Sequence, residues 1–93
     1  MRSAQGKGYR IELSVLINDP FDGMIRLLND VQRFGLSIVE TVMREAGGGH
    51  LVTLLLASDR AVDAEALGAR LGRHPCVVRV TTREGSQDLR HAA

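Results

Sequence analysis

The residues best suited to hold a small ligand lie where an alternating apolar segment ends, between Asn18 and Met24. This segment reads Asn-Asp-Pro-Phe-Asp-Gly-Met and joins a predicted strand to a predicted helix. Free backbone amides and the positive end of the dipole at a helix N-terminus can hold a carboxylate. A glycine at position 23 lets a ligand come close to the backbone. The residues alone favour a plainer interpretation, in which Gly23 eases the turn and Asp22 caps the helix.

No other set of residues predicts chemistry. Ser14 lies in the middle of a predicted strand and Cys76 at the start of another, and neither has a base nearby in the sequence that would activate it as a nucleophile. No two histidines have a spacing that presents them as metal ligands on one face, and we expect them on the surface: His50, His74 and His91. We therefore expect no catalytic residue, no metal and no cofactor.

Length and composition restrict the class of protein further. The 93 residues suffice for one domain, and 12 basic against 11 acidic side chains give a net charge of +1, which argues against nucleic acid as a partner. The single cysteine excludes an intramolecular disulfide. The sequence has no apolar stretch long enough to span a membrane and no apolar core of a signal peptide, so we expect a cytoplasmic protein.

The first half of the chain predicts a strand, a helix and a strand. Apolar residues alternate from Tyr9 to Ile17, the period of a half-buried strand. Spacings of three and four between Met24 and Phe34 then indicate an amphipathic helix, which Gly35 would end. A second strand is expected over residues 36–45, where the apolar residues change parity midway and suggest a β-bulge or a strand that twists away from its helix layer.

The second half repeats the pattern in the order strand, helix, strand. Residues 51–57 are apolar on both faces, which predicts the inner strand of a hairpin. Ser58 or Asp59 would cap a helix whose apolar stripe includes Leu67 and Leu71, and a short β-branched strand follows from Cys76. The domain is therefore expected over residues 9–82, with loose tails at 1–8 and 83–93.

This order predicts an α+β fold, a ferredoxin-like βαββαβ domain with a four-stranded antiparallel sheet and two helices on one face. The opposite face would receive Leu16 and several residues of the run Leu51–Ala57. An apolar second face on so small a domain implies a partner. Two other functions of this topology are weaker. An RNA-binding module would show aromatic residues on its middle strands, and an acylphosphatase-like enzyme would need an open phosphate loop where Asn18–Gly23 carries acids.

The sequence also resembles a known family. The turn followed by Met-Ile-Arg-Leu-Leu-Asn-Asp-Val-Gln-Arg-Phe-Gly-Leu-Ser-Ile looks like the opening of an ACT domain, in particular the small regulatory subunit of acetolactate synthase. The segment Ala57–Asp63, with the later run Val77-Val78-Arg79-Val80, resembles the second helix and last strand of that subunit. The similarity extends from Tyr9 to about Thr82.

The resemblance implies a non-catalytic regulatory domain. Such a domain pairs through its sheet with a second copy or with an ACT domain of another chain, activates a catalytic large subunit, and binds a branched-chain amino acid, valine or isoleucine. Carried over to this sequence, the ligand-binding residues would be Asn18, Asp19, Gly23, Met24 and Ser37. The sequence departs from the family pattern at Pro20 and Ser37, where effector-sensitive relatives usually carry asparagine. A free-standing ACT sensor of another amino acid or enzyme is the alternative.

Overall fold

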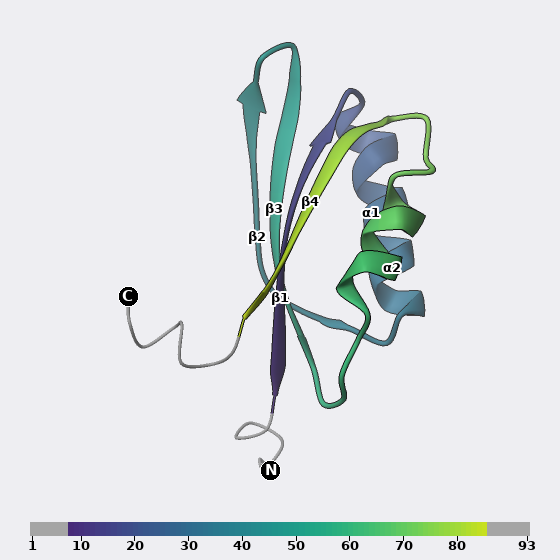
Figure 1. Cartoon of the computed structure of the whole chain (residues 1–93). Helices are drawn as coiled ribbons and strands as arrows, with labels where there is room; N and C mark the ends of the chain where they lie inside the picture. Colours follow the sequence, from purple (N-terminus) through teal and green to yellow (C-terminus); the bar gives the residue numbers. More distant parts are fainter. Residues whose placement is uncertain (1–7, 86–93) are drawn as a thin grey trace.

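The computed structural model describes residues 8–85, which form two layers (Figure 1). Both helices lie on one face of a four-stranded sheet, and within the described residues no helix or strand covers the other face. The elements follow in the order β1 (Tyr9–Ile17), α1 (Pro20–Arg33), β2 (Ser37–Ala46), β3 (Gly49–Ser58), α2 (Ala64–Leu71) and β4 (Val77–Gly85). The predicted ferredoxin-like α+β fold is therefore confirmed.

The sheet has the strand order β2-β3-β1-β4, and all neighbouring strands are antiparallel. β3 lies inside the sheet, as its doubly apolar sequence predicts, and pairs with β1 from Tyr9↔Ser58 to Ile17↔His50. β2 and β4 are the edges. The hairpin between β2 and β3 extends past the ends of the helices (Figure 1).

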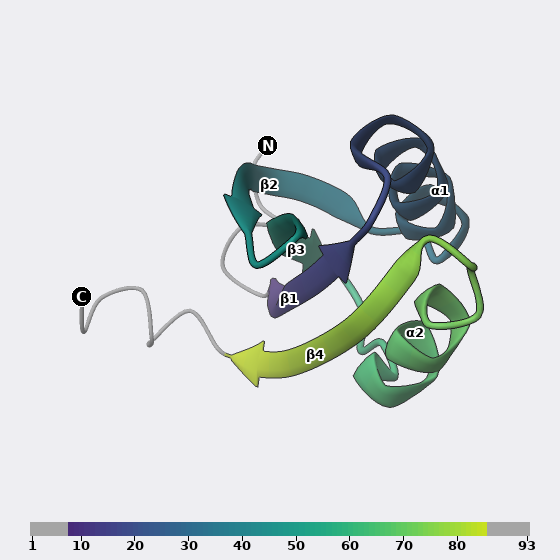
Figure 2. The same ribbon diagram turned by 90° about the horizontal axis from the view of Figure 1, so that it is seen from above.

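The core lies between the sheet and the two helices (Figure 2). Every second residue of β1 points into it, and these four side chains are at most 3% exposed: Ile11, Leu13, Val15 and Ile17. Their main neighbours in the same buried cluster are Val52, Leu54 and Leu56 of β3, Leu27 and Val31 of α1, and Ala64, Leu67 and Leu71 of α2. The alternate residues of β1 and β3 therefore point to the face without helices, which we call the bare face.

β2 behaves differently from its neighbours, because all of residues 37–45 are exposed. Its register with β3 shifts between Ile38 and Glu40, so that Val39 is an additional residue in the ladder. This is a β-bulge, one of the two explanations that the parity change suggested. It explains why the apolar residues of β2 change parity: Ile38 and Met43 lie opposite buried residues of β3 on the helix side, although one number is even and the other odd.

Asp19 caps α1, and the prediction that Asp22 would do so is wrong. The Oδ1 atom of Asp19 accepts hydrogen bonds from the backbone amides of Phe21 at 3.0 Å and Asp22 at 3.1 Å. The helix therefore begins at Pro20, whose missing N–H costs nothing in the first turn. Gly35 has a φ of 77°, a left-handed conformation, and follows the end of the helix as predicted.

Asp63 caps α2, and the prediction of Ser58 or Asp59 is wrong as well. The Asp63 carboxylate accepts from the amides of the second and third residues of the helix, Glu65 and Ala66. Ser58 instead ends β3, and its hydroxyl donates to the carbonyl of Arg60 at 2.7 Å and accepts from the amide of the same residue at 3.1 Å. The hydroxyl thus fixes a turn before the helix begins.

The ends of the ordered sheet differ slightly from the predicted domain of residues 9–82. β1 begins at Tyr9, but β4 continues to Gly85, because residues 83–85 pair with Glu12, Ile11 and Arg10. The remainder of both predicted tails, residues 1–7 and 86–93, lies outside the described residues. In the described part, neither helix has the length and apolar character needed to cross a membrane.

Candidate functional site

The turn between β1 and α1 continues into the first residues of α1, and this segment carries four of the five predicted ligand-binding residues: Asn18, Asp19, Gly23 and Met24. Its backbone amides are engaged within the chain. The amide of Asn18 donates to the carbonyl of Cys76 at 2.9 Å, and the amide of Gly23 donates to the carbonyl of Asp19 at 2.9 Å. Since the Asp19 carboxylate takes the amides of residues 21 and 22, a ligand carboxylate meets no free N–H at residues 21–23.

The acidic side chains of this turn are also committed. Asp22 binds Arg26 one helical turn later, with 2.8 Å between its Oδ2 atom and the Arg26 Nε atom, and both side chains are about half exposed. The hydrogen bond to Asp22 raises the pKa of Arg26. Two carboxylates at the start of α1 repel anions, which agrees with the expectation that this turn does not serve as a phosphate loop.

Gly23 is buried, and the structure gives it a packing role. A Cβ atom at this position would lie 2.8 Å from Cδ1 and 3.2 Å from Cβ of Ile17. The absence of a side chain therefore lets α1 lie directly on the end of β1. The side of Gly23 that faces Ile17 is not open to a ligand.

Ser37, the fifth predicted residue, lies at the opposite end of the sheet. It pairs with Ala57 on β3, whereas Ile17, next to the turn, pairs with His50. Seven residues of β3 separate these two levels, roughly 23 Å at ~3.3 Å per residue. A single copy of the chain therefore does not bring Ser37 and the turn to the same small ligand.

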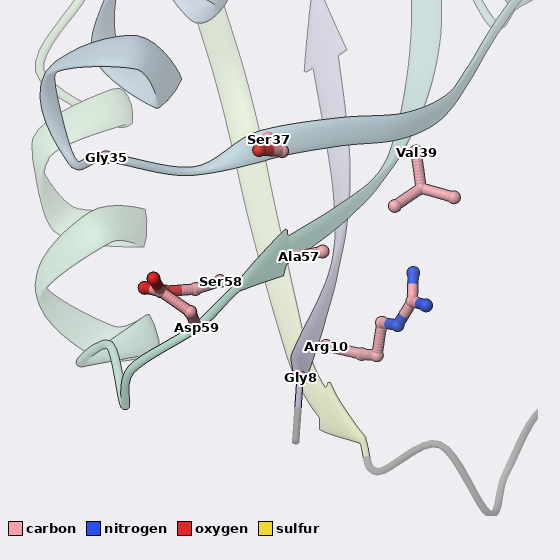
Figure 3. Close-up of a pocket in the computed structure, with 8 residues that line it drawn as sticks. All are labelled: Gly8, Arg10, Gly35, Ser37, Val39, Ala57, Ser58 and Asp59. Carbon is pink, nitrogen blue, oxygen red and sulfur yellow. The ribbon is translucent and has the colours of Figure 1, made fainter. Parts of the chain in front are cut away.

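A cavity of about 470 Å³ surrounds Ser37. Its lining includes Arg10 of β1, Val39 of β2, and Ala57 and Asp59 at the end of β3. In Figure 3 the side chains of Arg10, Val39 and Ala57 point to one side of the sheet, and that of Asp59 points to the other. The lining thus presents a guanidinium and two apolar groups on one side of the sheet, and the Asp59 carboxylate lies on the other side.

Arg10, which lines this cavity, carries a hydrogen-bond donor that is not satisfied among the described residues. Its Nε atom is buried and has no hydrogen-bond partner among the described residues. Buried donors in native proteins nearly always find an acceptor, and an arginine fits a carboxylate best. No pattern in the sequence singled out Arg10, because its neighbours in space come from β2 and β3 and depend on a register that a bulge shifts.

A second cavity of about 520 Å³ lies at the other end, at the hairpin. It is lined by Asn18, by Glu45 and His50, which pair across the two strands, and by residues 46–49 between them. The Nδ1 atom of His50 is buried and lacks a partner in the described part of the chain. Asn18 is the predicted ligand-binding residue that belongs to this cavity.

The bare face is less apolar than the sequence suggested. Leu16 of β1 and Leu51, Leu55 and Ala57 of β3 point there and are half-buried, as predicted. They share the face with charged side chains of the same two strands and of the edges, namely Arg10, Glu12, Glu40, Arg44, Arg79 and Arg83. A partner for this face needs both apolar contacts and charge complementarity.

Two of the three histidines depart from their predicted surface positions, because His50 and His74 are half-buried, and His91 lies outside the described residues. The Nε2 atom of His74 lies 2.7 Å from Oδ2 of Asp30, which is 7% exposed, and the Arg70 Nε atom lies 3.9 Å from the other carboxylate oxygen. This cluster connects α1 to the end of α2. It lines neither of the two cavities described above, and the described residues contain no group of three potential metal ligands.

Comparison with known proteins places the chain by its fold. No family model matches the sequence, and no curated protein does either. Among solved structures, the C-terminal domain of the MgtC protein from Mycobacterium tuberculosis is similar, with a TM-score of 0.74 and 17% identity over 85% of this chain and 89% of that one.

Two further structures have the same fold in proteins with other roles. The ACT domain from the GTP pyrophosphokinase of Chlorobium tepidum matches with a TM-score of 0.66 and 13% identity, over 82% of this chain and 99% of that one. The P2 domain of the chemotaxis kinase CheA from Thermotoga maritima, solved in complex with the response regulator CheY, matches with 0.66 and 16% identity over 84% and 99%. The chain therefore has an ACT-like ferredoxin fold.

Proposed function

We propose that this chain is a non-catalytic regulatory domain that binds a free amino acid and controls a partner enzyme. The observation that carries the proposal is the buried Nε atom of Arg10, which has no hydrogen-bond partner among the described residues and belongs to a side chain that lines a cavity large enough for an amino acid. The resemblance of the sequence to ACT domains and the similarity of the fold to an ACT domain support it. Because one fold serves many functions, the ligand chemistry rests on the cavity.

The cavity suits the parts of a branched-chain amino acid. Arg10 would receive the α-carboxylate through a charge-assisted hydrogen bond, and the hydroxyl of Ser37 would add a second donor. Val39 and Ala57, whose side chains point to the same side of the sheet as Arg10, would contact the aliphatic side chain. The predicted residues of the turn, Asn18, Asp19, Gly23 and Met24, would join this site only where a second copy brings its turn to Ser37.

The partner we propose is the catalytic subunit of acetolactate synthase, on the basis of the resemblance in sequence. Regulation requires that the effector binds one arrangement of the assembly better than another. A millimolar to micromolar effector supplies about 4–8 kcal/mol of binding free energy, which exceeds the roughly 1–3 kcal/mol of a usual allosteric coupling. Valine or isoleucine would therefore suffice to change the activity of the partner.

Thermal unfolding of the purified chain against the twenty amino acids tests ligand binding. A ligand at 100 times its Kd adds about 2.7 kcal/mol, which raises the Tm of so small a domain by on the order of 10 °C. We expect valine or isoleucine to produce this rise and Arg10→Gln to remove it. Arg79→Gln is the matched control, since Arg79 is also on the bare face but lies far from the cavity. A panel without any rise in Tm contradicts amino-acid binding.

Mixing the chain with the catalytic subunit of acetolactate synthase tests the partner. We expect the chain to have no turnover alone, to increase the rate of the catalytic subunit, and to reduce that increase when the effector is added. An amino acid that raises the Tm while the enzyme's rate stays unchanged identifies the alternative, a free-standing sensor for another enzyme. Hydrolysis of an acyl phosphate by the chain would contradict a non-catalytic role.

A further inference from the structure

The bare face of the sheet is positively charged, although the chain as a whole has a net charge of only +1. The bare face carries four arginines and two glutamates, whereas the rest of residues 8–83 carries five arginines and seven acidic side chains. One of the two glutamates, Glu12, already has Arg83 at 3.8 Å. Complementary charges attract and orient a partner, so this face is suited to an acidic surface.

The hairpin half of the bare face consists of three rows that cross the sheet from β2 to β4. Directly opposite residues in an antiparallel ladder share a face, so the registers define the rows. The first row is Arg44, Leu51, Leu16 and Arg79, the second is Val42, Thr53, Ser14 and Thr81, and the third is Glu40, Leu55, Glu12 and Arg83. Apart from Glu12, the two inner strands carry only leucines and hydroxyls, and the charges lie on the two outer strands.

The width of this apolar centre matches an α-helix. Neighbouring strands lie about 4.8 Å apart and a helix with its side chains is about 10–12 Å wide, so one helix covers β1 and β3 and leaves β2 and β4 at its sides. Four residues of β1 separate the first row from the third, roughly 13 Å, which corresponds to about nine residues of helix. Helices already cover the other face of the sheet (Figure 2), and a helix here would complete a three-layer arrangement.

We propose that an amphipathic helix of another protein, with acidic residues in its first turn, docks on the bare face along β1 and β3. Its apolar stripe contacts Leu16, Leu51 and Leu55. Its N-terminus lies over the first row, where acidic side chains on the two sides of the helix reach Arg44 and Arg79. Acidic residues also stabilise the first turn of a helix, so the composition that this face selects is one that helices favour.

A second copy of the chain fits the bare face less well than such a helix. If two bare faces met with their strands aligned, a two-fold axis parallel to the strands would place Arg44 opposite Arg79 of the partner subunit. An axis across the strands, through the second row, would place Arg79 opposite Arg83 of the partner subunit. Both arrangements bring arginines together, which is unfavourable. The charges of the face therefore favour a different, acidic partner.

The docking rests on the proposed function in one respect, because that function requires a partner. It is separate from the amino-acid site, since a helix of this length ends before the next row of the sheet, in which Arg10 pairs with Ala57. Binding of a peptide to the bare face is measured without any amino acid. Its failure is therefore distinguishable from an amino-acid panel that leaves the Tm unchanged.

An NMR titration of the full, isotope-labelled chain tests the docking surface. The probe is an alanine-rich helical peptide of about 15 residues, with leucines at i, i+4 and i+7 and with glutamates in its first turn, one on each side of the leucine stripe. We expect the amides around Leu16, Thr53 and Leu55 to shift and those of α1 and α2 to remain in place. Replacing the glutamates of the peptide by glutamines should weaken binding about tenfold, because two surface ion pairs are lost.

An exchange of charges tests which end of the sheet receives the acidic turn. The double variant Arg44→Glu, Arg79→Glu should bind the glutamate peptide at least about tenfold more weakly. The same variant should bind a peptide with lysines in place of the glutamates more tightly than the wild type does. Arg73→Glu, at an exposed position after α2, is the matched control and should bind both peptides like the wild type.

Three results would overturn the proposal. The first is a titration without shifts, and the second is a set of shifts confined to the helices. The third is a double charge variant that binds both peptides as the wild type does. If the amides of the bare face shift with the concentration of the chain itself and not with the peptide, the face belongs to a second copy instead.

Discussion

β1 and β2 are strands of nearly equal length with similar numbers of apolar residues, but their surroundings differ completely. β1 has strands on both sides and helices on one face, and its inward residues are at most 3% exposed. β2 has one neighbouring strand, and its apolar residues are 39–49% exposed. The stability of the single copy therefore depends on β1, whereas β2 keeps apolar residues that this copy does not bury.

This difference separates residues that maintain the fold from residues available for function. Burial of a valine side chain stabilises the folded state by about 1.5–3 kcal/mol, and an exposed one contributes little. A strand can therefore be apolar because its side chains fill the core or because they contact a partner. Only the position of the strand in the sheet distinguishes these two reasons. For β2, the position indicates a partner.

The largest expected contrast comes from one substitution made on each strand. Val15→Ala on β1 removes two buried methyl groups and should lower the free energy of unfolding by about 2–3 kcal/mol. Val42→Ala on β2 should lower it by less than about 0.5 kcal/mol when the chain is dilute enough to be monomeric. Urea denaturation of both variants measures the difference. Equal losses would show that β2 belongs to the core.

The sequence predicted the structure of β1 more completely than that of β2. The period of two identified β1 because its partners on both sides continue the alternation. The parity change in β2 suggested either a β-bulge or a strand that twists away from its helix layer, and the structure has the bulge, but the exposure of every residue from 37 to 45 was not predicted. Exposure depends on where the helices lie, and the spacings within α1 do not say which strands its apolar side covers. The edge position of β2 follows from pairing between distant segments.

The candidate site was predicted less well than the fold, for a related reason. The turn at Asn18–Met24 has the composition of a ligand loop, but the hydrogen bonds of Asp19 occupy its amides. Pro20 could have indicated the correct start of α1, since proline favours the first helical position. The cavity around Arg10 is lined by residues of three strands. No local sequence pattern indicates that these residues lie close together.

Gly23 tests the contact between α1 and the buried strand. Gly23→Ala should destabilise the domain by about 1–2 kcal/mol, because the new Cβ atom would lie 2.8 Å from Cδ1 of Ile17. Ile17→Val removes that Cδ1 atom, so the double variant should lose less than the sum of the two single losses. Additive losses in a double-mutant cycle would show that the two residues do not meet. Gly23 would then be free for the role in ligand binding that the sequence suggested.

Substitutions in the cluster at Asp30 test how much its polar contacts stabilise the packing of α1 against the end of α2. Asp30 is 7% exposed and binds His74 at 2.7 Å, so Asp30→Ala leaves the histidine without its acceptor. We expect losses of about 1–2 kcal/mol for Asp30→Ala and a coupling of about 1 kcal/mol with His74→Ala. Thermal unfolding of the two single variants and the double variant gives the coupling. A coupling of zero would assign the packing of the helices to their apolar contacts with the sheet.

The smallest effect concerns the start of α1, where sequence and structure name different aspartates. Asp19→Ala removes the acceptor of two backbone amides and should cost about 1 kcal/mol. Asp22→Ala removes an exposed ion pair with Arg26 and should cost no more than about 0.5 kcal/mol. Salt distinguishes them further, because screening weakens the exposed pair more than the cap. A larger loss for Asp22→Ala would indicate that Asp22, not Asp19, caps the helix. The amides of residues 21 and 22 would then be free, and the turn would again be a candidate anion site.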